Sequence, residues 1–134
     1  MRDPNKLMVT EQATTLAVEV YRLTSDFPSS ERFGLAAQMR RAAVSVGSNI
    51  AEGCGRSGDR DFVRFLQIAR GSTTELAFQL SVAMELGLGR STEQARVAET
   101  IDHLQRMLNR LTASMRKKGS APRRGERATT PQPE

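Results

Sequence analysis

Apolar residues recur along this chain at alternating spacings of three and four, in four successive blocks. That spacing places them on one face of an α-helix, whereas a half-buried strand would alternate apolar and polar residues, and no block does so. The blocks predict helices over about residues 9–25, 28–55, 59–86 and 92–117. Because the connections are short, each helix is expected to run back along its predecessor. The sequence therefore predicts an all-α, antiparallel, up-down-up-down four-helix bundle.

Residues at the expected helix boundaries agree with this division. Pro28 suits the first turn of the second helix, and Gly87 or Gly89 is expected to end the third. The segment 91–94 predicts a capping box, in which the Ser91 hydroxyl accepts a hydrogen bond from the Gln94 amide while the Gln94 side chain reaches back.

The length of the chain limits what it can do. At 134 residues it fits one domain and is too short for an enzyme with a cleft between two domains. No apolar run reaches the roughly 20 residues that cross a bilayer, and the N-terminus does not resemble a secretory signal. We therefore expect a soluble protein without a membrane partner. Cys54 is the single cysteine and excludes an internal disulfide, which favours the reducing cytoplasm.

The net charge of +5 is concentrated at the C-terminus. Residues 116–134 hold six basic and two acidic side chains, whereas the remaining residues hold 14 basic and 13 acidic ones and are nearly neutral. The composition of residues 118–134 is rich in Pro, Gly, Ser and Thr and predicts a disordered basic tail. Residues 1–8 are predicted to be a flexible N-terminus, which leaves residues 9–117 for the bundle.

Two of the expected helices carry apolar residues on a second face. A doubled apolar stripe indicates either a thick core or a subunit interface, and we favour self-association. The residues of this second face are Val63, Ile68, Phe78, Val82, Ala98 and Met107.

The second expected helix combines small and polar residues. Ala43, Gly47, Ala51 and Gly55 recur at a spacing of four, and small side chains in one row let a neighbouring helix approach closely.

Polar residues on the second and third helices predict a structural network that fixes the register of the helices, because buried polar groups need partners. The alternative, a catalytic acid held by a guanidinium, is disfavoured. The residues of the expected network are Arg41, Asn49, Glu52 and Glu75.

Few residues are available for catalysis or metal binding. His103 is the single histidine, which excludes a zinc site built on a histidine pair, and Cys54 has no companion for a thiolate cluster. The chain also lacks the glycine-rich loop that cradles phosphates. We therefore expect no enzymatic activity, no metal and no cofactor.

Arginine clusters are the candidate nucleic-acid contacts, because the guanidinium fork suits phosphates. Arg56, Arg60 and Arg64 recur at a spacing of four and predict a basic ridge around the start of the third helix, although Asp59 and Asp61 adjoin it. The complete set of expected binding residues is Arg56, Arg60, Arg64, Arg70, Arg116, Lys117, Lys118, Arg123 and Arg124.

The segment from Tyr21 to about Leu86 resembles the four-helix-bundle family of the 23S rRNA intervening-sequence proteins. This chain departs from the family by having Gly47 where proline is usual, and it lacks an aromatic residue common early in the first helix. The residues that carry the resemblance are Phe27-Pro28, Glu31, Gln38, Arg41, Ser48-Asn49-Ile50-Ala51-Glu52-Gly53, Arg56, Phe65-Leu66, Gly71-Ser72 and Glu75-Leu76.

The resemblance implies a ring-like homo-oligomer, a pentamer, without known catalytic activity. The fold also resembles the accessory protein of diversity-generating retroelements, a basic pentameric bundle that associates with a reverse transcriptase and its template RNA. Because one fold hosts many functions, two hypotheses stay open. The first is an oligomeric module that binds structured RNA or another nucleic acid through its arginines. The second is a scaffold that docks another protein, such as a reverse transcriptase.

Overall fold

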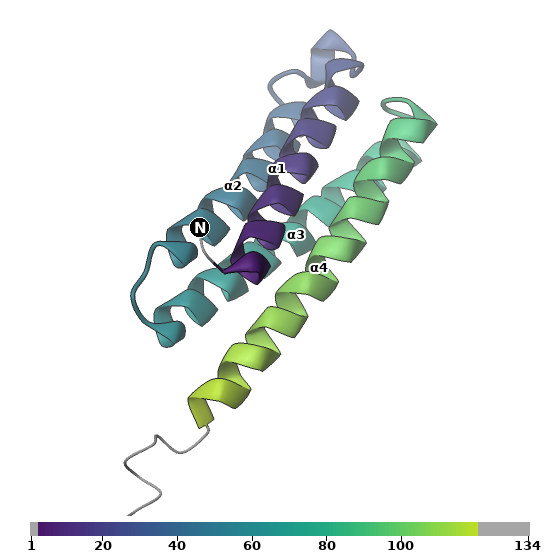
Figure 1. The fold of residues 1–134 in the computed structure, drawn as a ribbon. Coiled ribbons are helices and arrows are strands. Elements are labelled where there is room, and N and C mark those ends of the chain that lie inside the picture. The colour runs from purple at the N-terminus through teal and green to yellow at the C-terminus, as the bar shows by residue number, and fades with distance from the viewer. Residues whose placement is uncertain (1–2, 121–134) are drawn as a thin grey trace, which may run out of the picture.

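A computed structural model gives the fold of residues 3–120 and the side chains of residues 3–118. The helices are α1 (Pro4–Ser25), a short 3-10 helix η1 (Ser29–Glu31), α2 (Leu35–Cys54), α3 (Asp59–Glu85) and α4 (Ser91–Ser120), and the described residues form no strand. Figure 1 shows the four long helices side by side, with successive helices running in opposite directions. The predicted all-α four-helix bundle is confirmed.

Each long helix packs against two neighbours, so that the four surround one core. α1 contacts α2 and α4, and α3 contacts the same two helices from the opposite side. The core is formed by the apolar faces that the sequence spacing predicts. Its largest fully buried side chains are Phe62, Leu16, Leu23, Met39, Ile50, Leu66, Leu76, Leu104, Leu108, Val9, Val20 and Val46.

The first helix begins five residues earlier than its apolar spacing predicts. The Asp3 carboxylate accepts a hydrogen bond of 2.9 Å from the Asn5 backbone N–H, and Pro4 occupies the first helical turn. An N-terminal cap and a proline at this position both stabilise a helix start. The expectation of a flexible stretch over residues 1–8 was therefore wrong for residues 4–8.

The second helix begins later than predicted, at Leu35 instead of residue 28. Residues 29–31 form the separate turn η1, and Gly34 leaves the helical conformation with ψ −113°. One carboxylate oxygen of Glu31 accepts a hydrogen bond of 3.2 Å from the Leu35 backbone N–H. Glu31 thus satisfies a free N–H group at the start of α2 from outside the helix.

The connection between α3 and α4 replaces the predicted capping box with a different arrangement. Gly87 has φ +68°, and the Leu88 N–H donates to the Ala83 carbonyl over 2.8 Å, as in a Schellman motif. The Gln94 side-chain amide donates to the Leu88 carbonyl, also over 2.8 Å. Gln94 therefore fastens the preceding loop and does not reach back to Ser91.

The fourth helix extends beyond the predicted boundary at residue 117. α4 continues to Ser120, so the expected disordered tail was wrong for residues 118–120. The rest of that tail, residues 121–134, lies outside the described residues.

Gly53 lets α2 approach α3 closely near the end of α2, whereas Gly47 faces α1. A Cβ atom added at Gly53 would lie 2.8 Å from the Phe65 Cβ and 3.1 Å from the Phe62 Cδ1. A Cβ at Gly47 would meet the Ala13 Cβ at 3.8 Å, which is an ordinary contact. Close approach of the backbones therefore requires glycine at position 53, whereas position 47 has room for alanine.

This difference predicts opposite effects of the same substitution at the two positions. Gly53→Ala should lower the free energy of unfolding by about 1–2 kcal/mol net, because overpacking outweighs the gain in helix propensity. Gly47→Ala should raise it by up to about 1 kcal/mol, because only the gain in propensity remains. Chemical denaturation at one fixed protein concentration measures both values. A Gly53→Ala protein as stable as the Gly47→Ala protein would contradict the packing described here.

Candidate nucleic-acid interface

The predicted ridge of three arginines is divided by the end of a helix. α2 ends at Cys54, so Arg56 lies in the loop before α3 and the spacing of four does not place it on α3. The chain reversal nevertheless brings Arg56 and Arg64 to the same aromatic ring. Their guanidinium carbons lie 5.1 and 4.8 Å from the centre of the half-buried Phe65 ring, within the range of cation–π attraction.

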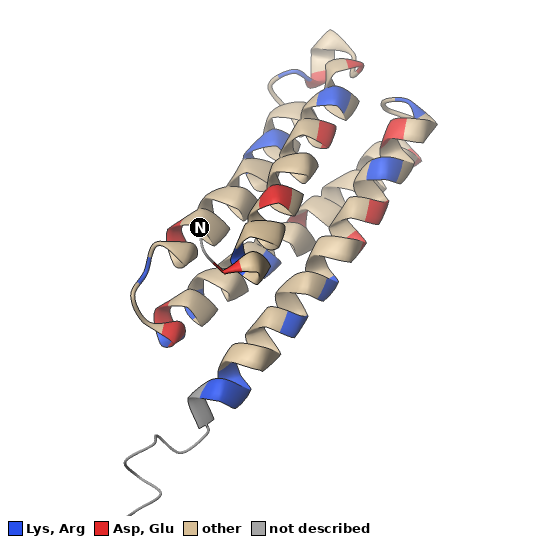
Figure 2. Ribbon diagram, viewed as in Figure 1, with Lys and Arg blue, Asp and Glu red and all other residues tan. Residues whose placement is uncertain are grey.

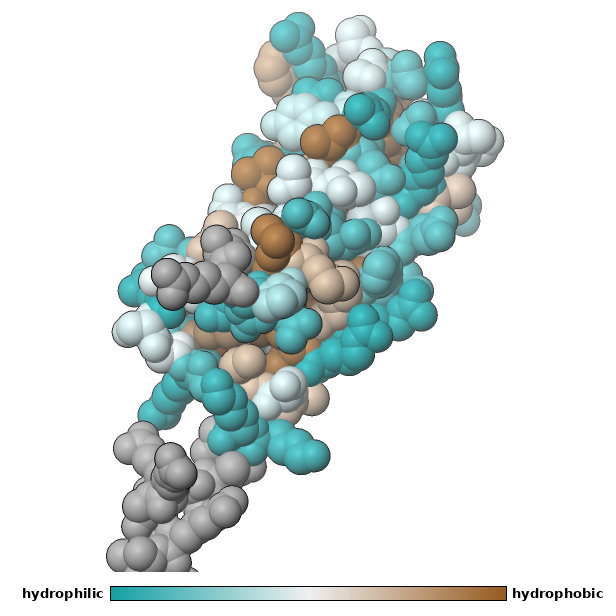
Figure 3. Space-filling view, in the orientation of Figure 1, coloured by the Kyte–Doolittle hydropathy of each residue, from teal (hydrophilic) through white to brown (hydrophobic). Residues whose placement is uncertain are grey.

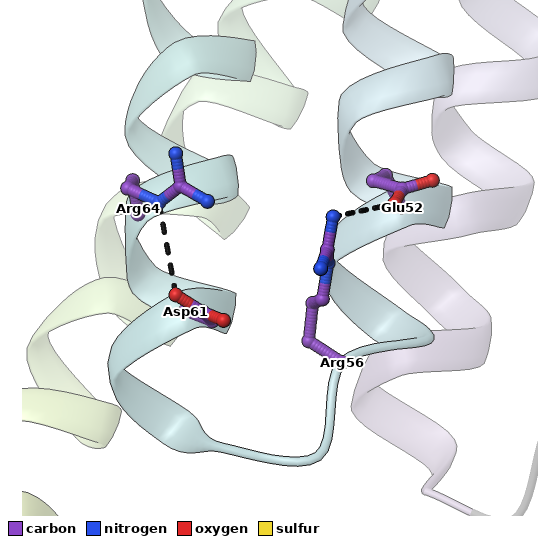
Figure 4. A network of polar contacts seen from close by, with 4 residues as sticks. All are labelled: Glu52, Arg56, Asp61 and Arg64. Atoms are coloured by element: carbon purple, nitrogen blue, oxygen red, sulfur yellow. Dashed lines mark hydrogen bonds and ion pairs between the residues drawn. The ribbon is translucent and has the colours of Figure 1, made fainter.

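Carboxylates neutralise this arginine pair locally. Arg56 forms an ion pair of 2.8 Å with Glu52, and Arg64 lies 3.7 Å from an Asp61 carboxylate oxygen. Figure 4 shows the two pairs on facing sides of the hairpin between α2 and α3. Each of these two arginines thus already contacts both a carboxylate and the Phe65 ring, and this double partnering fits a structural clamp.

The other predicted binding residues lie on different parts of the molecule. Arg60 and Arg116 line a groove of about 340 Å³ between α3 and α4, together with Asp59. Arg70 is exposed in the middle of α3. The Lys118 ammonium lies 3.6 Å from an Asp59 carboxylate oxygen.

Lys117 is exposed near the end of α4, and Arg123 and Arg124 lie outside the described residues.

The second half of α4 carries two basic residues that are not among the binding residues predicted from the sequence. Arg106 and Arg110 are exposed and precede Arg116, Lys117 and Lys118 on the same helix. Between residues 103 and 120 the sequence contains no aspartate or glutamate. Figure 2 shows the blue segments along this half of α4, with the red segments of the helix confined to its first half. The absence of carboxylates over 18 consecutive residues is the sequence signal that identifies this surface.

The four residues of the expected polar network are distributed over separate contacts. The Asn49 amide donates to the Ser45 carbonyl over 2.8 Å, and the Ser45 hydroxyl lies 3.1 Å from the Ser72 hydroxyl of α3. Glu75 accepts from the Gln79 amide, while Glu52 pairs with Arg56 as described.

Arg41 is the fourth residue of the expected network and lines a groove. Glu75 lines the same open groove, which has a volume of about 710 Å³ and lies between α2 and α3. Polar contacts do join the two helices, through the serines, but the four residues form no single network within the described part of the chain.

The predicted second apolar face is only partly exposed. The side chains of Phe78 and Ile68 on α3 are 69% and 44% exposed, whereas Met107 is buried in the core at 7%. Met107 was therefore wrongly assigned to the second face. Figure 3 shows the opposite side of the molecule, formed by α1 and α4, as largely hydrophilic with small apolar patches.

The candidate reactive residues stand apart from one another. His103 is exposed on α4, and the half-buried Cys54 sulfur lies 4.0 Å from the Thr10 hydroxyl of α1. Among residues 3–118, no group of three or more His, Cys, Asp or Glu side chains is placed to hold a metal ion. None of the helices in the described residues is long and apolar enough to cross a membrane.

Comparison with known proteins identifies the family of this fold. The model of the 23S rRNA-intervening sequence protein family matches residues 5–110. A crystal structure of a protein of unknown function from the S23 ribosomal protein family of Bacteroides thetaiotaomicron has the same fold, with a TM-score of 0.74 and 18% sequence identity over 81% of this chain and 98% of that one. Comparison with curated proteins gives no match. The chain therefore belongs to the 23S rRNA-intervening sequence protein family.

Proposed function

We propose that this protein is a non-catalytic, homo-oligomeric module of the cytoplasm that associates with structured RNA through basic side chains. The observation that carries the proposal is the separation of charge along α4. Five exposed basic residues follow one another from Arg106 to Lys118 without an acidic residue between them. Such a surface attracts a polyanion without reading its sequence. The name of the family refers to 23S rRNA, which makes structured RNA the first ligand to test.

Exposed apolar side chains on α3 support the oligomeric part of the proposal. Ile68 and Phe78 are exposed and Val82 is half-buried, and their spacings of ten and four place all three on one side of α3. Burying a phenylalanine side chain contributes about 1.5–3 kcal/mol, which an exposed ring forgoes. A second copy of the chain would bury these side chains, and a pentameric ring would repeat the basic surface of α4 in every subunit.

The same α3 face supports a second candidate function. An exposed phenylalanine next to aliphatic residues is also suited to a different protein partner. The protein would then act as a scaffold, such as an accessory subunit of a reverse transcriptase. A purified complex with a reverse transcriptase that survives nuclease treatment would favour this alternative.

RNA association predicts binding that weakens steeply with salt. A fluorescently labelled RNA hairpin titrated with the protein should show an affinity that falls about a hundredfold or more between 50 and 200 mM salt, because counterions are released when five or more phosphates are neutralised. Fluorescence anisotropy measures this dependence. Absence of binding at 50 mM salt, or binding without a salt slope, would contradict the proposal.

Self-association predicts a specific effect of one phenylalanine. Phe78→Ser should shift the oligomer toward smaller species at micromolar concentration, because an apolar contact is lost at every interface. Phe33→Ser is the matched control, since Phe33 is 87% exposed but lies between η1 and α2, outside the α3 face, and should leave the mass unchanged. Light scattering coupled to size exclusion gives the masses. A monomeric wild-type protein would refute the oligomeric proposal.

A further inference from the structure

Three basic residues on α4 share one outward face of the helix. Arg106, Arg110 and Lys117 follow one another at spacings of four and seven, which return to the same side of an α-helix. At 1.5 Å per residue they extend over about 16 Å of a straight helix. Arg116 and Lys118 lie on either side of this line. We call these five residues the α4 basic strip.

The helix dipole does not account for the α4 basic strip. Cations favour the last turn of a helix, and this accounts for Lys117 and Lys118. The effect is confined to the last turn, whereas Arg106 lies 14 residues before the end of α4 at Ser120. Arg106 and Arg110 therefore need another explanation.

Carboxylates pair with part of the α4 basic strip but not with its whole length, and Lys118 at its end lies 3.6 Å from an Asp59 carboxylate oxygen. Within residues 3–118, the structure pairs neither Arg110 nor Arg116 with a carboxylate. Arg106 forms an ion pair of 3.1 Å with Asp102, but both side chains are about two-thirds exposed, and such a pair contributes little. A phosphate can replace it at small cost.

The chemistry around the α4 basic strip indicates contact with a backbone and not with bases. α4 contains no Phe, Tyr or Trp on which a base could stack, and its one aromatic ring is the imidazole of His103. Arg110 lies at the edge of a shallow groove of about 240 Å³ that Met8 of α1 also lines. The strip is narrow and follows a rod, which suits a single polyanionic strand better than the plane of an anionic membrane.

We propose that the α4 basic strip, and not the arginine pair beside Phe65, binds the phosphate backbone of RNA, with Arg106 and Arg110 as its central contacts. This inference rests on the proposed function and goes beyond it, because it assigns the binding surface and the mode of recognition. Binding is independent of base sequence and requires the charge of the two arginines.

The test compares two double substitutions that remove the same charge. Arg106→Gln/Arg110→Gln should weaken binding to an RNA hairpin about tenfold or more and reduce the steepness of the log–log salt dependence by about 1.4–1.8 for each strip in contact. Arg90→Gln/Arg96→Gln, near the start of α4, is the matched control and should change both values little. Arg106→Lys/Arg110→Lys keeps the charge and should keep the salt slope. Circular dichroism checks that every variant retains its helices.

Each result decides between specific alternatives. If the strip variant and the control weaken RNA binding equally, the assignment of the strip is wrong, while RNA association through overall charge stands. If Arg56→Gln/Arg64→Gln removes binding and the strip variant does not, the contact lies beside Phe65. If the wild-type protein binds phosphatidylserine vesicles but not the hairpin, both the strip assignment and the proposed function fail.

Discussion

The close contact between α2 and α3 at Gly53 is the constraint that positions Phe65 and the two arginines beside it. The two backbones approach so closely there that a single added methyl group would overlap the Cβ of Phe65. This approach holds Phe65 beneath the guanidinium groups of Arg56 and Arg64, and it fixes where the chain leaves α2 and enters α3. Close packing therefore positions one set of arginines, but it also surrounds them with carboxylates.

The α4 basic strip differs from that cluster in what lies next to the charges. Glu52 and Asp61 already pair with Arg56 and Arg64, so an incoming phosphate gains little from them. On the second half of α4, Arg106 pairs with Asp102 and Lys118 with Asp59, whereas Arg110 and Arg116 have no carboxylate partner within residues 3–118. The pairing of each cation, more than the number of cations, decides which surface attracts a polyanion. An oligomer that repeats the strip would strengthen a modest attraction.

The sequence predicts the four helices because each carries a long apolar face, and that face decides the fold. Their ends are less predictable, because the Asp3 side chain caps α1 and the backbone of Gly34 leaves the helical conformation before α2, and apolar spacing depends on neither. The arginine ridge was inferred from a spacing of four, which has meaning only within one helix, and Arg56 lies outside α3. Arg106 and Arg110 were not among the predicted binding residues, because those were chosen as clusters of cations. The feature that distinguishes these two arginines is the absence of aspartate and glutamate from residues 103–120.

Hydroxyl-radical footprinting with and without RNA tests the central claim, that copies associate through α3 while α4 faces the ligand. In the free protein, Phe78 should be oxidised more slowly than its 69% exposure in one chain implies. Added RNA should protect Met8, which is 56% exposed beside Arg110, and leave Phe33, between η1 and α2, unprotected. Protection of Phe33 by RNA with no change at Met8, or oxidation of Phe78 as rapid as that of Phe33, would contradict the account.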